Sequence, residues 1–126
     1  MNSDERSAIF LLAMQVGALN GERLSNEDIF LIKKISINIF GKEGINTGDD
    51  FAEKIKSGEI NKTTSINLLK HLNEKEKTQC MAICIAAAYV DDDVSKLQEQ
   101  YLDIINEEWD INMDEAIKLY LQNKDF

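Results

Sequence analysis

The apolar residues of this 126-residue chain recur at helical spacing almost from one end to the other. No stretch alternates apolar and polar residues as a half-buried strand does. Proline, which interrupts helices, is absent. The pattern therefore predicts an all-α fold, in which residues 1–126 form one compact domain, a bundle of about seven helices. The expected helices cover residues 4–18, 25–40, 49–57, 63–72, 73–90, 95–109 and a last segment that begins near residue 112.

Two of these segments are apolar on nearly every face. Residues 9–14 read Ile-Phe-Leu-Leu-Ala-Met, and residues 80–88 read Cys-Met-Ala-Ile-Cys-Ile-Ala-Ala-Ala. A helix that is hydrophobic all round belongs in the middle of a bundle. The helices over 4–18 and 73–90 are therefore predicted to be central. Residues that favour helix N-caps precede five of the expected helices: Ser3, Ser25, Asn73, Ser95 and Asn112.

Each predicted central helix leads through a short polar turn into an amphipathic helix, which looks like a weakly duplicated helical hairpin about a pseudo-twofold axis. The second unit holds Asp91-Asp92-Asp93 and Glu99, and the first holds Asn20-Gly21-Glu22 and Glu27. These residues resemble the TerB-like, tellurite-resistance-associated family of small all-helical domains. In that family an Asp-Gly-acid turn follows a small apolar helix and precedes a Glu-bearing helix.

The resemblance implies a domain that works by binding, with acidic turns that contact a partner or hold a divalent cation. Calcium or magnesium would be the ion, because hard cations take several oxygen ligands. Two positions depart from the family pattern: Asn20 stands where the family has an aspartate, and Asp92 stands where it has a glycine. The residues predicted to ligate the metal are Asp91, Asp93, Glu99, Asn20, Glu22 and Glu27.

The formal net charge of −9 is concentrated in one segment. Residues 91–115 contain ten acidic residues and a single basic one, Lys96, whereas the rest of the chain has 13 of each. Phosphate backbones are bound by Lys and Arg, so this segment is not expected to bind nucleic acid. A basic protein surface or a cation is the better partner.

Within that segment, Glu99, Asp103 and Glu107 recur at i, i+4 and i+8, so they stack on one side of the expected helix. Three interpretations of this acidic face stay open: a solvated face, a docking surface for a basic partner, and metal coordination. The three aspartates before the helix can also be explained by capping, because negative charge favours a helix N-terminus. The residues predicted to contact a partner are Asp91, Asp92, Asp93, Glu99, Asp103, Glu107 and Asp110.

The side chains that usually carry catalysis or bind zinc are few. Cys80 and Cys84 share a helix face, but the single histidine, His71, is on the preceding helix, so the thiols are expected to be buried as small hydrophobes. His71 is expected to be partly exposed, and Trp109 to lie in the core. A phosphate-binding loop, a nucleophile elbow and a His-Glu-x-x-His pair are all missing, so we predict that the protein is not an enzyme.

Two functions from different classes fit these features. The first is a TerB-like acidic binding domain in stress response or defence, which acts through electrostatic contact with a protein. The alternative is an immunity protein that neutralises a cognate toxin, with a basic nuclease as the expected target. A self-associating scaffold is a weaker third reading, and a monomer is favoured over a homo-oligomer. The acidic N-terminus and the short apolar runs predict a cytoplasmic protein without a membrane anchor.

Overall fold

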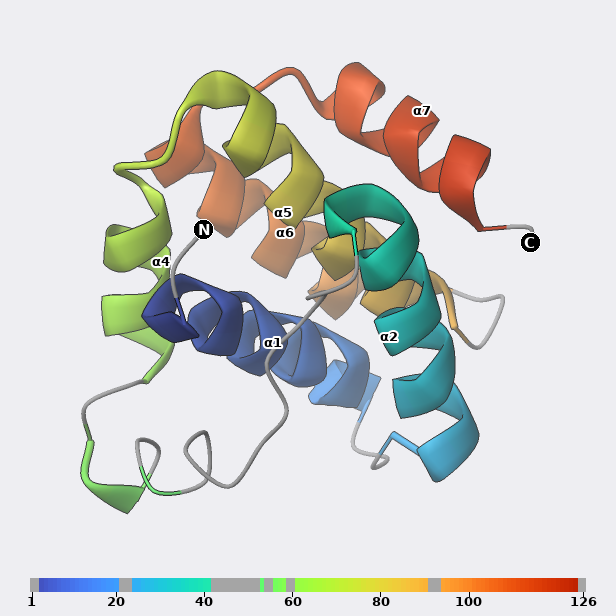
Figure 1. Cartoon of the computed structure of the whole chain (residues 1–126), viewed down its shortest axis with the longest axis horizontal. Coiled ribbons are helices and arrows are strands. Elements are labelled where there is room, and N and C mark those ends of the chain that lie inside the picture. The colour runs from blue at the N-terminus through green and yellow to red at the C-terminus, as the bar shows by residue number, and fades with distance from the viewer. Residues whose placement is uncertain are drawn as a thin grey trace.

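The computed structural model describes residues 3–20, 24–41, 53, 56–58, 61–90 and 94–124. Every regular element in this part of the chain is a helix, which confirms the predicted all-α fold. Six α-helices are described, one fewer than predicted, because the expected helix over 49–57 lies mostly outside these residues. The elements are α1 (Ser3–Gly17), a 3₁₀ turn η1 (Ala18–Asn20), α2 (Asn26–Phe40), α4 (Lys62–Leu69), α5 (Glu74–Tyr89), α6 (Lys96–Trp109) and α7 (Met113–Asn123) (Figure 1).

Most helices begin where the sequence places their caps. Ser25 caps α2 through a reciprocal pair, in which its hydroxyl accepts from the Asp28 backbone and the Asp28 carboxylate accepts from the Ser25 backbone. Asn73 and Ser95 cap α5 and α6 as predicted. The first helix differs by one residue, because Ser3 is its first helical residue rather than its cap.

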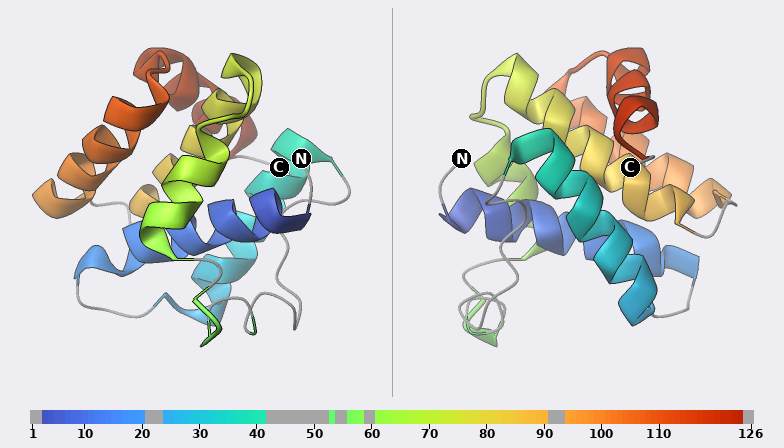
Figure 2. Two further views of the ribbon diagram at one scale, coloured as in Figure 1. Left: turned by 90° about the vertical axis from the view of Figure 1, so that its left-hand side faces the viewer. Right: turned by 45° about the vertical axis from the view of Figure 1, so that its right-hand side comes forward.

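The core is built on α1 and α5, which pack against each other (Figures 1 and 2). Residues 80–88 of α5 are all buried, and so are residues 7–13 of α1. The prediction that these two helices are central is confirmed. Because α5 is surrounded on every side, its small residues, four of them alanine between positions 82 and 88, let its neighbours approach closely.

The remaining helices cover this pair from different sides. α2 and α7 pack on α5, α4 packs on α1, and α6 contacts α1, α4 and α5 (Figure 2). The second helix of the first hairpin therefore packs on the central helix of the second hairpin. In the described part of the chain, no helix combines the length and the apolar character that crossing a lipid bilayer requires.

A glycine lies in close contact with Leu24 at the end of α1. A Cβ atom at Gly17 would lie 2.7 Å from both terminal methyl carbons of Leu24. That distance is well below carbon–carbon van der Waals contact. Glycine at position 17 thus allows Leu24 to pack directly on the end of α1.

Candidate functional site

α6 is held in place by its inner side and by its two ends. Its buried residues include Tyr101, Ile105 and Trp109. Gln98 is also buried; its side-chain oxygen accepts from the Ser95 backbone, and its amide donates to the Val16 carbonyl at 3.0 Å. One glutamine therefore completes the cap of α6 and ties this helix to α1.

The outer side of α6 carries the predicted acidic residues. Glu99, Asp103 and Glu107 are all exposed and follow one another one turn apart. Among the described residues, no lysine or arginine forms an ion pair with any of the three. We call Glu99, Asp103 and Glu107 the acidic stripe. The structure thus brings together three of the residues predicted to contact a partner.

Two neighbouring acids have different surroundings. Glu108 is neutralised by Lys70 of the α4 end, whose Nζ lies 3.1 Å from the Glu108 carboxylate. Asp110 is exposed and follows the helix as its C-cap, with a left-handed backbone (φ 52°) and its N–H donating to the Asn106 carbonyl at 2.8 Å. Asp110 therefore marks the end of α6 rather than extending the acidic stripe.

Apolar side chains border the acidic stripe. Leu97 is 59% exposed and Ile104 is 50% exposed, although the helical spacing groups both with the buried side of α6. The buried residues of α6 cover a narrower part of the helix circumference than its apolar residues do. The reason is that α6 lies at the edge of the bundle and contacts its neighbours along one side only. Leu97 and Ile104 are seven residues apart, so they share one flank of the stripe.

The predicted turn residues can be only partly placed. Asp91, Asp92, Asp93 and Glu22 lie outside the described residues, and so does the side chain of Asn20. Glu27 is exposed in the first turn of α2. Within the described part of the chain, no cluster of three or more His, Cys, Asp or Glu side chains could hold a metal ion. The metal site stays a prediction.

The sulfur, imidazole and indole side chains lie where the sequence suggests. Cys80 and Cys84 are buried thiols that form no disulfide bond, and burial raises the pKa of Cys84 to about 12. The predicted burial of the two cysteines is confirmed, and a thiol that stays protonated is a poor nucleophile and a poor metal ligand. Trp109 is fully buried, and its indole N–H donates to the Ile66 carbonyl of α4 at 3.0 Å. His71 is exposed and lies just beyond α4, whereas it was predicted to be a partly exposed residue within the helix over 63–72.

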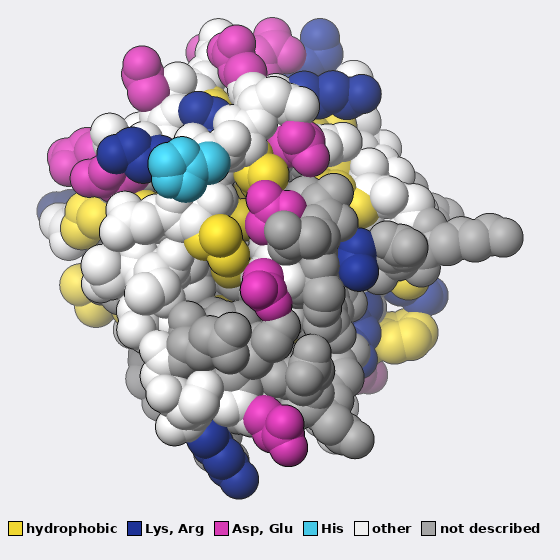
Figure 3. Space-filling model, turned by 60° about the vertical axis from the view of Figure 1, so that its left-hand side comes forward, with side chains coloured by type: hydrophobic (Ala, Val, Ile, Leu, Met, Phe, Trp, Pro, Cys, Tyr) yellow, Lys and Arg dark blue, Asp and Glu magenta, His cyan; other side chains and the backbone are white. Residues whose placement is uncertain are grey.

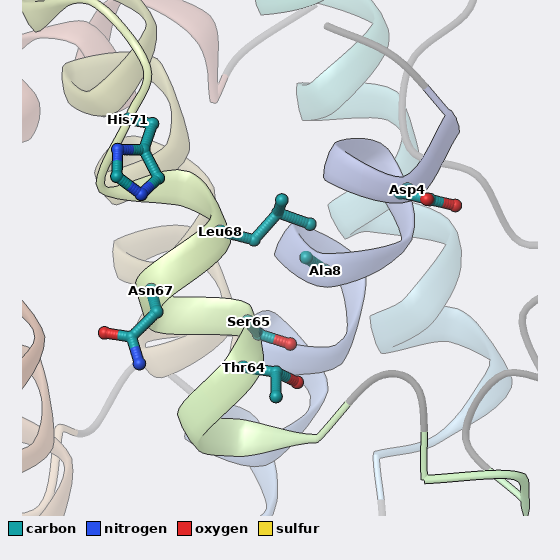
Figure 4. Close-up of a pocket in the computed structure, with 7 residues that line it drawn as sticks. All are labelled: Asp4, Ala8, Thr64, Ser65, Asn67, Leu68 and His71. Carbon is teal, nitrogen blue, oxygen red and sulfur yellow. The ribbon is translucent and has the colours of Figure 1, made fainter.

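A second candidate site, a groove between α1 and α4, was not predicted. Its volume is about 420 Å³, and its lining includes Ala8, Ser65, Leu68 and His71. Figure 3 shows this face, on which the histidine lies next to a basic side chain and the nearby exposed hydrophobic side chains are bordered by acidic ones. In Figure 4, Ser65 and Leu68 extend from α4 toward α1, and Ala8 faces them. The sequence does contain a signal, because Ser65 shares one face of the helix predicted over 63–72 with Leu69 and Leu72 and so is a polar residue at an apolar position.

Comparisons of the chain with protein-family models, with curated proteins and with solved structures find no match. The TerB-like assignment accordingly stays a resemblance of sequence pattern.

Proposed function

We propose that the protein is a non-enzymatic binding protein that docks a basic protein surface onto the acidic stripe of α6. The observation that carries this proposal is the exposure of Glu99, Asp103 and Glu107 on one helix face, without an ion-pair partner among the described residues. Carboxylates spaced four residues apart repel each other and cost a few tenths of a kcal/mol per pair. A cationic partner would turn that repulsion into attraction.

The apolar flank supports a protein as the partner. Leu97 and Ile104 place two half-exposed aliphatic side chains beside the acidic stripe. Protein interfaces combine an apolar centre, which supplies affinity, with surrounding charges, which guide association and specificity. A free metal ion would gain nothing from the aliphatic side chains. The combination thus favours electrostatic protein–protein contact, with calcium or magnesium binding as a secondary property.

Two biological settings share this surface. A TerB-like role in stress response or defence is the first, and inhibition of a basic toxin is the second. The second is favoured by the same apolar flank, because a dedicated inhibitor needs buried anchor residues in addition to charge. Co-expression with a toxin encoded beside the gene distinguishes them: an immunity protein restores growth, whereas a stress-response domain leaves the toxin active.

Charge reversal on the stripe tests the proposal. The double variant Asp103→Lys with Glu107→Lys should retain its helical circular dichroism but should lose the proteins that the wild type captures from lysate at low salt. The control is Glu74→Lys with Glu115→Lys, which changes the net charge equally at exposed positions on α5 and α7. Capture should also weaken at about 1 M salt, where the Debye length falls to ~3 Å. Unchanged capture by the stripe variant, or equal loss in the control, would contradict the proposal.

The proposed binding of calcium or magnesium has its own test. Titration of the wild type with calcium and with magnesium in a calorimeter should give heat that Glu99→Gln reduces. The absence of heat at millimolar ion concentration would contradict the proposed metal binding and leave the protein-docking proposal intact.

A further inference from the structure

The groove between α1 and α4 contains a polar group that the fold does not use. Ser65 is 1% exposed, and its Oγ has no hydrogen-bond partner among the described residues. Its backbone N–H is satisfied by the Asn61 carbonyl at 2.8 Å, so only the hydroxyl is left over. A buried hydroxyl without a partner destabilises the fold, because it gives up its bonds to water.

Another buried serine shows how such a hydroxyl is normally satisfied. Ser36 on α2 is fully buried, and its Oγ donates to the Lys33 carbonyl one turn earlier at 2.7 Å. Ser65 has a helical turn before it as well, yet its hydroxyl makes no such bond. A buried serine in a helix therefore does not have to leave its hydroxyl without a hydrogen bond. At Ser65 the hydroxyl that makes no such bond belongs to a residue that lines the groove.

The side chains that face into the groove set the chemistry of an occupant. Leu68 and Ser65 extend from α4 toward α1, and Ala8 faces them (Figure 4). The carboxylate of Asp4 points away from α4, and Thr64 Oγ1 is already engaged with the Asn61 backbone. Among the described lining residues, the surface directed into the groove thus consists of aliphatic groups and one available hydroxyl, and no charged side chain points into it.

We infer that this groove binds a small uncharged amphiphile, an aliphatic chain of a few carbons that ends in one polar head such as a hydroxyl. The head bonds to Ser65 Oγ, and the chain packs against Ala8 and Leu68. An ionised head would lose hydration, and no described side chain directs an opposite charge toward it, so charged analogues are not expected to bind. Such a site, largely apolar with one orienting polar group, has the usual composition of small-molecule pockets. The inference is independent of the acidic stripe.

Nuclear magnetic resonance with three probes of equal chain length tests the chemical class. Addition of n-pentanol should shift the methyl signals of Ala8 and Leu68 in a saturable way at millimolar concentration. The ions n-pentanoate and n-pentylammonium should leave these signals unchanged over the same range. Equal binding of either ion would overturn the assignment of an uncharged ligand, and failure of n-pentanol to bind would overturn the site.

A matched pair of serine variants tests the role of the hydroxyl. Ser65→Ala should melt at a higher temperature than the wild type and should bind n-pentanol about tenfold more weakly, because one hydrogen bond is lost. The control Ser36→Ala should melt at a lower temperature and bind n-pentanol like the wild type. Lower stability in Ser65→Ala would show that the hydroxyl has a partner in the fold, and unchanged binding would show that it does not hold the ligand; either result overturns the inference.

Discussion

α5 and α6 follow each other along the chain and have similar lengths, yet their surroundings differ completely. Nine consecutive residues of α5, 80–88, are buried, whereas the buried residues of α6 lie on one side and its acidic stripe lies on the other. The sequence of residues 80–88 is constrained by packing in every direction, so it carries information about the fold. The residues on the outer side of α6 are exposed, so core packing does not constrain them. Their composition can therefore be interpreted in terms of binding.

The largest effect expected from this difference follows removal of side-chain volume. Ile83→Ala empties part of a fully buried site on α5 and should lower the free energy of unfolding by about 3 kcal/mol. Ile104→Ala removes the same atoms from a half-exposed position on α6 and should cost less than about 1 kcal/mol. Urea denaturation at neutral pH measures both. Similar losses would mean that the outer side of α6 is packed after all.

A smaller effect concerns the inner side of α6, which should behave like α5. Tyr101 is buried and donates its hydroxyl to the Gln15 side chain at 2.9 Å. Burial, assisted by the nearby Cys84, raises the pKa of Tyr101 from 10.0 to about 12. Between these pH values the unfolded chain loses the phenol proton first, so stability should fall as the pH rises from 10 to 12.

Tyr101→Phe isolates this contribution, because Cys84 titrates in the same range and is retained in both proteins. The wild type should lose on the order of 2 kcal/mol more than the variant between pH 10 and pH 12. Parallel stability curves for the two proteins, obtained by urea denaturation at each pH, would show that the phenol is solvated.

The smallest effect is expected on the acidic stripe itself. Asp103→Asn with Glu107→Gln removes the like-charge pairs along α6 and should stabilise the protein by about 0.5 kcal/mol at low salt. The control Glu27→Gln with Glu115→Gln removes two carboxylates that favour helix N-termini and should destabilise by a similar amount. Thermal unfolding at low and high salt compares the two. Destabilisation by the stripe variant would instead show that these carboxylates stabilise the folded protein.

Local features of the structure could be predicted from the sequence. Ser25, Asn73 and Ser95 begin helices because a side-chain oxygen of the N-cap residue satisfies a nearby backbone N–H, which is a matter of a few neighbouring residues. The burial of Trp109 and of α5 follows from apolar content alone. The exposure of Glu99, Asp103 and Glu107 follows from their common helical face.

The features that could not be predicted depend on which helix lies where. Leu97 and Ile104 have the spacing of core residues, and they are exposed only because α6 lies at the edge of the bundle. The hydroxyl of Ser65 lacks a partner among the described residues, and the side chain that faces it is Ala8 of α1, 57 positions earlier in the chain. Gln98 bonds to Val16 across an even longer separation of 82 positions. The periodicity of the sequence predicts which face of a helix a residue lies on, but the arrangement of the helices determines what that face contacts.

The buried indole of Trp109 gives the molecule a built-in optical reporter. It is the only tryptophan in the chain, so selective excitation yields emission from one position. Its hydrogen bond to Ile66 joins α6 to α4, and the Lys70–Glu108 ion pair lies at the same junction. Separation of the two helices would expose the ring to water and shift its fluorescence to longer wavelength. Stopped-flow fluorescence can therefore follow the opening of this junction in the unmodified protein.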